Sequence, residues 1–313
     1  MSDRPKLAEI RAASDRIKSV ACRTPLVPFR PGEETDVRLK VETHQPMASF
    51  KIRGVYNAVA TMTDEERAHG VSTVSAGNTA QALAWTARHF GVSARSVMPD
   101  HAPTNKIEAV QRLGATPVLL PMDEVFAYMK GHGWEKEPYA FVHPWTDKRV
   151  MTGHGTMGIE IIEDFPDVDS VFIPVGGGGL LGGVGSALKA LKPDVRIFGV
   201  EPECCPSLYQ SIQDGKPASV ECKTICDGVA VPYITDEMYP LLSSLVEKVV
   251  LVSEETVRET VRTLCLVQKL IVEPAGALAL AAALATPRVE RGKTVCIVSG
   301  GNLDADLLTE ILQ

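Results

Sequence analysis

Residues 171–183 read VFIPVGGGGLLGG, and six of the eight residues from Gly176 to Gly183 are glycine. The apolar run predicts a buried strand, and the stretch 180–191 after the glycines predicts a helix. Glycines at such a strand-to-helix turn expose backbone N–H groups, and the N-terminus of the helix adds positive charge. The segment therefore predicts a phosphate-binding loop.

Short runs rich in β-branched residues alternate with helical patterns along most of the chain. Non-alternating apolar strands are typical of parallel sheets that helices cover on both faces. The expected fold class is therefore α/β, in two lobes that meet near residues 143–147. Strands are predicted at 71–74, 94–98, 116–120, 171–175, 196–200, 248–252 and 294–298, and helices at 79–90, 104–113, 124–131, 180–191 and from Arg149.

The composition excludes several classes of protein. The net charge of −7 over 313 residues, without a basic stripe, argues against nucleic-acid binding. The N-terminal residues are polar, and the longest uncharged stretch, 170–188, contains seven glycines, so neither a secretory signal nor a membrane span is expected. Seven cysteines, an odd number, suggest reduced thiols and a cytoplasmic protein. A metal held by Cys204, Cys205, Cys222 and Cys226 lacks the usual ligand spacing.

The glycine segment also fits a second kind of phosphate ligand. Gly177-x-Gly179-x-x-Gly182 satisfies the dinucleotide fingerprint, and Glu201 follows roughly 20 residues later, as that fingerprint requires. A nicotinamide cofactor is therefore an alternative. However, the fingerprint usually opens the first strand–helix unit of its domain, whereas this one lies in the middle of the chain.

Three polar segments accompany the glycine loop. SFKIRG spans residues 49–54, SAGNT spans 75–79 at the end of a predicted strand, and SGGN spans 299–302 at the end of another. Taken singly, each also reads as an ordinary turn, helix cap or solvated lysine. Taken together, they are explained by pyridoxal phosphate, a phosphorylated cofactor that a lysine binds as a Schiff base.

The order and spacing of SFKIRG, SAGN, GGGG and SGGN resemble those of the fold type II (β-family) pyridoxal-phosphate enzymes, in particular the serine/threonine dehydratase and serine racemase group. The likeness extends over nearly the whole chain and includes residues 153–156, 227–230 and 273–276. It implies two open, twisted, mostly parallel sheets flanked by helices, as in the tryptophan synthase β fold. A large domain (1–68 and 146–313) would carry an inserted, smaller and mobile domain (69–145). The regulatory domain that biosynthetic threonine deaminases append after SGGN is not expected.

The same resemblance implies roles for individual residues. Lys51 is the catalytic residue and forms the Schiff base. The residues implied to bind the cofactor are Phe50 beside the ring, Asn78 at the ring hydroxyl, Ser299 at the pyridine nitrogen, and Gly176, Gly177, Gly178, Gly179 and Leu180 at the phosphate. The residues implied to bind the substrate carboxylate are Ser75, Ala76, Gly77, Asn78 and Thr79.

The chain departs from this pattern at four positions. Ala76 stands where serine racemases carry a second, proton-exchanging serine, and this favours elimination over racemisation. Thr79 replaces the usual histidine. Trp145 stands where relatives have asparagine or phenylalanine; it would form an apolar wall for the substrate or simply pack the joint between the lobes. Glu201 matches one carboxylate ligand of a divalent cation in relatives, but Ser207 stands at the second, so a cation is an open possibility.

The implied function is that of a lyase. It would convert a 3-hydroxy L-amino acid (threonine, serine or 3-phenylserine) to a 2-oxo acid and ammonia, and the resemblance implies a homodimer. An amino-acid racemase or a synthase of the same fold, a nicotinamide-dependent oxidoreductase, and a non-catalytic amino-acid sensor remain as alternatives.

Overall fold

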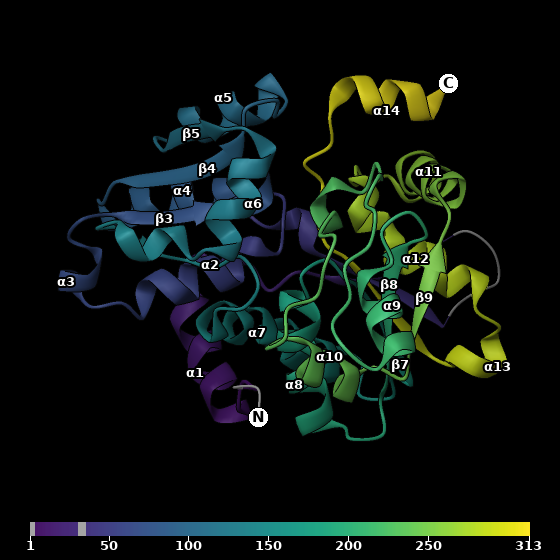
Figure 1. Cartoon of the computed structure of the whole chain (residues 1–313). Coiled ribbons are helices and arrows are strands. Elements are labelled where there is room, and N and C mark those ends of the chain that lie inside the picture. The colour runs from purple at the N-terminus through teal and green to yellow at the C-terminus, as the bar shows by residue number, and fades with distance from the viewer. Residues whose placement is uncertain (1–3, 31–35) are drawn as a thin grey trace.

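The computed structural model describes residues 4–30 and 36–313, and two separate sheets form its framework (Figure 1). The larger sheet has six strands in the order β1-β2-β10-β7-β8-β9, and only the β1–β2 pair is antiparallel. Its strands are β1 (Leu26–Pro28), β2 (Val37–Val41), β7 (Ser170–Pro174), β8 (Arg196–Pro202), β9 (Lys248–Val252) and β10 (Thr294–Val298). The mostly parallel α/β architecture that the sequence predicts is therefore confirmed.

The smaller sheet has four parallel strands in the order β5-β4-β3-β6. They are β3 (Val71–Val74), β4 (Ala94–Pro99), β5 (Thr116–Leu120) and β6 (Ala140–Phe141), so all of them fall within the inserted segment 69–145. We call this sheet with its covering helices α4 (Asn78–Phe90), α5 (Thr104–Arg112) and α6 (Met122–Lys130) the small lobe, and the rest the large lobe. The domain boundaries themselves stay a prediction.

Helices of the large lobe cover the larger sheet and line the joint between the lobes. They are α1 (Leu7–Ile17), α2 (Lys51–Ala60), α3 (Asp64–Arg67), α7 (Lys148–Asp164), α8 (Gly179–Leu191), α9 (Ser207–Asp214), α10 (Tyr239–Leu245), α11 (Glu254–Thr263), α12 (Pro274–Ala285), α13 (Arg288–Arg291) and α14 (Ala305–Leu312). The helix α2 packs against both α4 and α7, and therefore touches both lobes (Figure 1). Close approach of α7 and α8 requires Gly183, since a Cβ there would overlap the backbone oxygen of Met151.

The seven strands that the sequence predicts are all present, within two residues at each end. Three others, β1, β2 and β6, are not anticipated. The strands β1 and β6 span only three and two residues. The strand β2, Val-Arg-Leu-Lys-Val, carries a lysine that a buried strand normally excludes. Lys40 is nevertheless fully buried, because its Nζ lies 2.6 Å from the carboxylate of Glu160 on α7.

The cysteines differ from the expectation of reduced thiols. Cys205, just after β8, and Cys222 form a disulfide that closes a loop between positions 17 residues apart. The other five cysteines are free thiols. Within the described residues, no helix combines the length and the apolar character needed to cross a bilayer.

Candidate active site

Lys51 is the first residue of α2, and the backbone around it is tied to the end of β10. The N–H of Phe50 donates to the carbonyl of Ser299 at 3.0 Å, and Ser49 forms an isolated β-bridge with Gly300. The segments SFKIRG and SGGN, which lie near opposite ends of the sequence, are therefore neighbours in the fold. This contact places the start of α2 at the carboxyl end of the larger sheet, where open α/β sheets bind ligands.

The amine of Lys51 lies in a mostly apolar environment. Its Nζ is 4.9 Å from the centroid of the Phe50 ring. Burial lowers the pKa of Lys51 to about 8, while the attraction of Glu273 opposes the shift. The amine is therefore neutral in a much larger fraction of molecules near neutral pH than an ordinary lysine, which suits a nucleophile for an aldehyde and a general base.

Arg53, two residues further along α2, anchors the helix that carries Lys51. Its guanidinium lies 2.8 Å from the carboxylate of Glu42 and 2.6 Å from that of Glu160. Arg53 is 1% exposed and Glu42 is 0% exposed, so these charges satisfy one another inside the protein. Buried, hydrogen-bonded charge networks fix geometry because breaking one partner leaves an uncompensated charge. We infer that this network sets the position of α2.

The glycines form a narrow loop between β7 and α8. A Cβ at Gly176 would lie 3.0 Å from Cα of Val229, and one at Gly179 would lie 2.9 Å from Cα of Trp145. At Gly177, a Cβ would overlap the indole of Trp145. Neighbouring residues thus leave no space for side chains on this loop. The loop leads directly into the N-terminus of α8, which begins at Gly179. This is the geometry of an anion site at a helix N-terminus.

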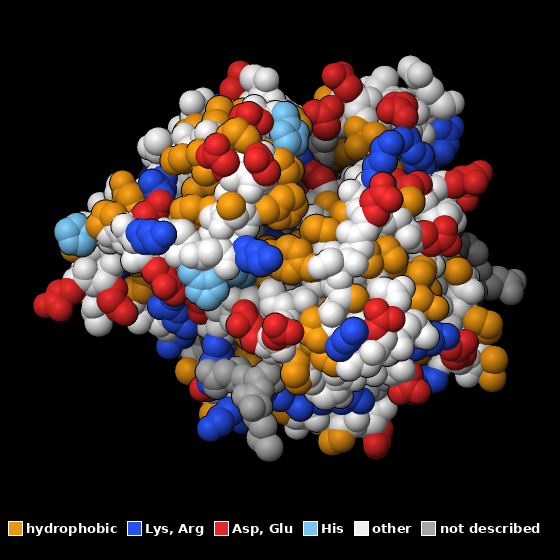
Figure 2. All heavy atoms as spheres, viewed as in Figure 1, with side chains coloured by type: hydrophobic (Ala, Val, Ile, Leu, Met, Phe, Trp, Pro, Cys, Tyr) orange, Lys and Arg blue, Asp and Glu red, His pale blue; other side chains and the backbone are white. Residues whose placement is uncertain are grey.

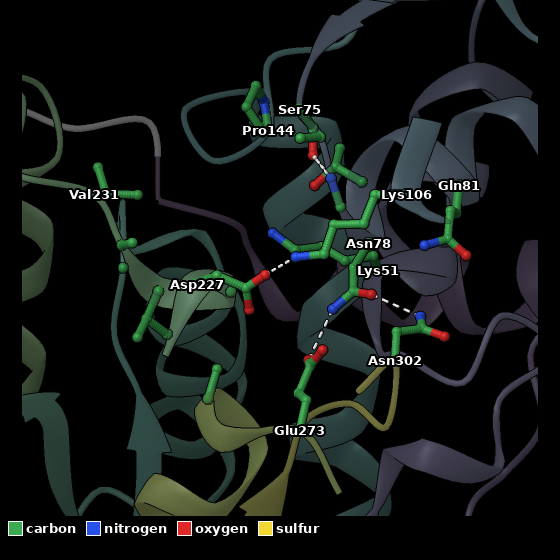
Figure 3. A pocket seen from close by; sticks show the side chains of 18 of the residues that line it. Lys51, Ser75, Asn78, Gln81, Lys106, Pro144, Asp227, Val231, Glu273 and Asn302 are labelled. Atoms are coloured by element: carbon green, nitrogen blue, oxygen red, sulfur yellow. Dashed lines mark hydrogen bonds and ion pairs between the residues drawn. The ribbon is translucent and has the colours of Figure 1, made fainter. Parts of the chain in front are cut away.

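Asn78 links the two lobes through both atoms of its amide. Its Nδ2 donates to Glu273 at 2.8 Å, and its Oδ1 accepts from Nδ2 of Asn302 at 2.7 Å (Figure 3). Glu273 is 4% exposed and precedes the first residue of α12. Burial raises the pKa of Glu273 to about 7, and the hydrogen bond from Asn78 works in the opposite direction. Asn78 is therefore held in one orientation at the wall of the cavity.

The segment Ser75–Thr79 passes from the end of β3 into α4. Ser75, Ala76 and Gly77 form the connection, and Asn78 and Thr79 are the first residues of the helix. The backbone N–H of Gly77 is directed to the Oγ of Ser75 at 3.1 Å. The N-terminus of α4 thus faces the same space as the glycine loop, and a carboxylate would be stabilised there.

One cavity of about 640 Å³ brings these segments together. It lies between the lobes, where the view in Figure 2 shows hydrophobic side chains gathered along the middle of the molecule. Every residue that the sequence predicts for the cofactor or the substrate lines it: Phe50, Lys51, Ser75, Ala76, Gly77, Asn78, Thr79, Trp145, Gly176, Gly177, Gly178, Gly179, Leu180 and Ser299. The individual roles of these residues stay predictions.

Glu201, the predicted metal ligand, lies outside this cavity and has another function. Its buried carboxylate accepts hydrogen bonds from the N–H groups of Leu208 (2.8 Å) and Tyr209 (2.9 Å) and from the hydroxyl of Ser207 (3.1 Å). It therefore caps α9, and these donors would repel a cation at the same oxygens. No cluster of three His, Cys, Asp or Glu suited to a metal occurs among residues 4–30 and 36–313.

This position of Glu201 also weakens the nicotinamide alternative, because a carboxylate that caps a buried helix is not free to bind a ribose hydroxyl. Trp145 lines the cavity and also packs on the glycine loop, so both of its expected roles are compatible with its position.

Other polar residues line the cavity without a role assigned from sequence, and among them are Lys106, Asp227, Glu273 and Asn302. Asp227 and Glu273 belong to motifs that the family resemblance includes, and Asn302 ends SGGN. Lys106 carries no local signal, since a lysine in an amphipathic helix is ordinary.

The residues present fit pyridoxal phosphate. The glycine loop offers a cradle that any Cβ would fill, and a partly buried lysine, Lys51, whose pKa is lowered, lines the same cavity. Phe50 and the side chains of Asn78 and Ser299 lie around the space between them. An anionic tail, an aldehyde and a polar aromatic ring would therefore each find a complementary group.

Comparisons with known proteins agree with this chemistry. A protein-family model described as "Pyridoxal-phosphate dependent enzyme" matches residues 17–301. The L-threonine ammonia-lyase of Thermotoga maritima is 40% identical over 314 residues, which covers 98% of this chain and 78% of the relative.

Solved structures resemble the whole chain. The structure of maize serine racemase has a TM-score of 0.91 at 31% identity and covers 98% of this chain and 96% of its own. The processed form of threonine deaminase isoform 2 from Solanum lycopersicum has a TM-score of 0.89 at 31% identity and covers 99% of this chain and 95% of its own.

Proposed function

The chain belongs to the pyridoxal-phosphate dependent enzyme family, and we propose that it is a lyase that deaminates a 3-hydroxy L-amino acid, with threonine as the first candidate. The observation that carries this proposal is the pairing of a partly buried lysine, Lys51, with a glycine cradle, Gly176–Gly179, in one cavity. A relative at 40% identity is named an L-threonine ammonia-lyase, and this supports threonine as the substrate.

The cofactor supplies a conjugated ring that accepts the electron pair released when the bond between Cα and its hydrogen breaks. Lys51 would hold the cofactor, and its amine would be the base that removes the Cα proton. The N–H groups at Gly176–Leu180 would hold the phosphate, and Ser299 would serve the pyridine nitrogen. A neutral serine, unlike a carboxylate, would not keep that nitrogen protonated, and this would favour elimination of the β-hydroxyl.

The remaining residues position the substrate. The N-terminus of α4, at Ser75–Thr79, would bind its carboxylate. Asn78, which Glu273 and Asn302 orient, would contact the ring hydroxyl. The hydroxyl on Cβ and the proton taken from Cα together would leave as water, and a second water would hydrolyse the released enamine to the 2-oxo acid and ammonium. For threonine, the products are therefore 2-oxobutyrate and ammonium.

Racemisation is the second candidate, since a serine racemase shares the fold with a TM-score of 0.91. Inverting Cα requires a second proton donor on the face opposite Lys51. Ala76 lines the cavity where serine racemases carry that serine, and a methyl group has no proton to exchange. Elimination is therefore the favoured reaction.

We also propose that the enzyme is a cytoplasmic homodimer that works on a small-molecule amino acid. Light scattering during gel filtration would measure the oligomeric state, with a mass of twice 33.7 kDa expected. A divalent cation is not included, because the oxygens of Glu201 are already occupied by donors from α9.

Borohydride reduction followed by peptide mass spectrometry tests the proposed function. We expect a yellow protein whose visible band disappears on reduction and a pyridoxyl adduct on Lys51. The Lys51→Ala variant is expected to lose the band and all deamination of threonine. An adduct on another lysine, or substantial activity of the variant, would contradict the proposal. Comparing kcat/KM for threonine, serine and 3-phenylserine would then rank the substrates.

A further inference from the structure

Two polar contacts join helix α5 of the small lobe to the large lobe at the cavity. The ammonium of Lys106 forms an ion pair with Asp227, which begins the short 3₁₀ helix η3 (Asp227–Val229) (Figure 3). The neighbouring Asn105 donates its Nδ2 to Oδ2 of Asp304 at 2.6 Å. The partners are 121 and 199 residues apart in sequence, so neither contact follows from local structure. Both points therefore hold the lobes together.

The ion pair is partly shielded from water. The side chain of Lys106 is 21% exposed and that of Asp227 is 50% exposed, and both residues line the cavity. Burial lowers the pKa of Lys106, while the acidic groups of Glu273 and Asp304 oppose this change. An ion pair in such a place is stronger than one in open solvent, because screening is weaker.

Asp227 is connected to the phosphate cradle through its own chain. Val229, two residues after Asp227, packs closely on Gly176: a Cβ on Gly176 would lie 3.0 Å from Cα of Val229. The attraction between Lys106 and Asp227 therefore acts on residues 227–229, which pack against the glycine loop.

The second contact connects to the site in a similar way. Asp304 also accepts the N–H of Asp306 with its other oxygen and so caps α14. Two residues earlier, Asn302 bonds to Asn78. Both contacts thus end beside groups that hold the cofactor or the substrate.

We propose that Lys106 and Asp227 form a clasp that keeps the small lobe closed over the bound substrate, with Asn105 and Asp304 as its second point. We assign these residues a positioning role, because they act through η3 and the residues that follow β10. Closure excludes water and brings the N-terminus of α4, which binds the carboxylate, toward the glycine loop. The inference rests on the proposed function, since it assigns the clasp a role in that reaction.

Charge reversal provides the test. In the holoenzyme, Lys106→Asp and Asp227→Lys each place like charges together, and we expect KM for threonine to rise about tenfold, with a smaller change in kcat and an unchanged cofactor band. The double variant restores an ion pair of opposite polarity and is expected to return KM to within about threefold of wild type. Lys130→Asp, at the exposed end of α6, is the matched control for the change of net charge in Lys106→Asp and should leave KM unaltered.

Hydrogen–deuterium exchange adds a measurement that does not depend on turnover. We expect residues 101–113 and 225–231 to exchange faster in each single variant and at the wild-type rate in the double variant. If the single variants leave KM and exchange unchanged, or if the double variant restores neither, the clasp is refuted.

The two proposals can fail separately. If no 3-hydroxy amino acid is a substrate, the proposed function fails while the exchange data still decide whether Lys106 and Asp227 hold the lobes together. If a reversed variant does not fold, Lys106→Met and Asp227→Asn replace it, and both must then accelerate exchange in the same two segments.

Discussion

Asn78 donates a hydrogen bond of 2.8 Å to the carboxylate of Glu273, 195 positions further along the chain. The bond joins the first residue of α4 in the small lobe to the residue that precedes α12 in the large lobe. Asn302 donates to the amide oxygen of Asn78, so the amide NH₂ group of Asn78 is the end that faces Glu273. The hydrogen bonds from Asn302 to Asn78 and from Asn78 to Glu273 thus fix the orientation of Asn78. They also connect the small lobe to the large lobe at the site.

Glu273→Gln is predicted to change how the stability of the apoprotein depends on pH. Burial raises the pKa of Glu273 from 4.5 to about 7, so the folded protein holds a proton that the unfolded chain releases between these pH values. The contribution of Glu273 to stability is therefore present below pH 4.5 and is lost as pH rises to about 7. Glutamine keeps an acceptor for Asn78 without titrating. Urea unfolding at pH 5 and pH 7.5 should show a smaller decline for the variant; equal declines would contradict the assignment.

Gly177→Ala is predicted to weaken cofactor binding by about 5- to 150-fold, because overpacking of this kind costs roughly 1–3 kcal/mol. Its Cβ would overlap the indole of Trp145 and push the glycine loop out of shape. Titration of the apoprotein with pyridoxal phosphate, followed by absorbance, measures the effect. In a Trp145→Ala background, the same change should cost less. Equal costs in both backgrounds would mean that the indole is not the obstacle.

The cofactor side of the site could be predicted from sequence because its signals are local. Four consecutive glycines after an apolar run, a lysine at the start of a helical pattern, and polar turns at strand ends each depend on neighbouring residues only. Parallel strands end at one edge of a sheet, so the glycine loop and SGGN, which follow neighbouring strands of the larger sheet, had to converge. The strands β7 and β10 confirm this, since Ser299 directly follows β10 and Gly176 comes just after the end of β7.

The contacts that hold the site in place could not be predicted in this way. Arg53 pairs with Glu160 across 107 residues, and Lys106 pairs with Asp227 across 121. Each is a single charged residue in an ordinary helical pattern, and nothing nearby reveals its partner. The metal role predicted for Glu201 is not supported for a related reason. Its position in the motif is correct, but the chain returns after β8 and places the N-terminus of α9 on its carboxylate.

Glu201→Ala is predicted to destabilise the protein by roughly 2–3 kcal/mol, because it leaves two backbone N–H groups and one hydroxyl buried without an acceptor. Cofactor affinity should stay near the wild-type value, since Glu201 lies outside the cavity. Chemical unfolding and cofactor titration measure the two quantities. Addition of Mg²⁺ or EDTA should not shift the thermal midpoint of the wild type. If Mg²⁺ raised the thermal midpoint of the wild type but not that of Glu201→Ala, Glu201 would be a cation ligand and this assignment would be wrong.

Uptake of pyridoxal phosphate by the apoprotein is predicted to quicken as pH rises to about 8. Only the neutral amine of Lys51 attacks an aldehyde, and burial lowers its pKa to about 8 from the usual 10.5. An unperturbed lysine would show the increase about two pH units higher. Stopped-flow absorbance over pH 6–10 measures the rate, with Lys51→Ala as the blank. A midpoint near 10 would show that the amine is solvated before the cofactor binds.

Ala76→Ser is predicted to add racemisation to elimination. Ala76 lines the cavity on the connection between β3 and α4, where a hydroxyl would be able to exchange a proton with Cα. Chiral chromatography of residual serine after incubation with the L-isomer should show D-serine for the variant and almost none for the wild type. Ala80→Ser, a buried change in the first turn of α4, is the matched control for an added hydroxyl. If Ala76→Ser produces no D-serine while its elimination activity is retained, position 76 does not decide between the two reactions.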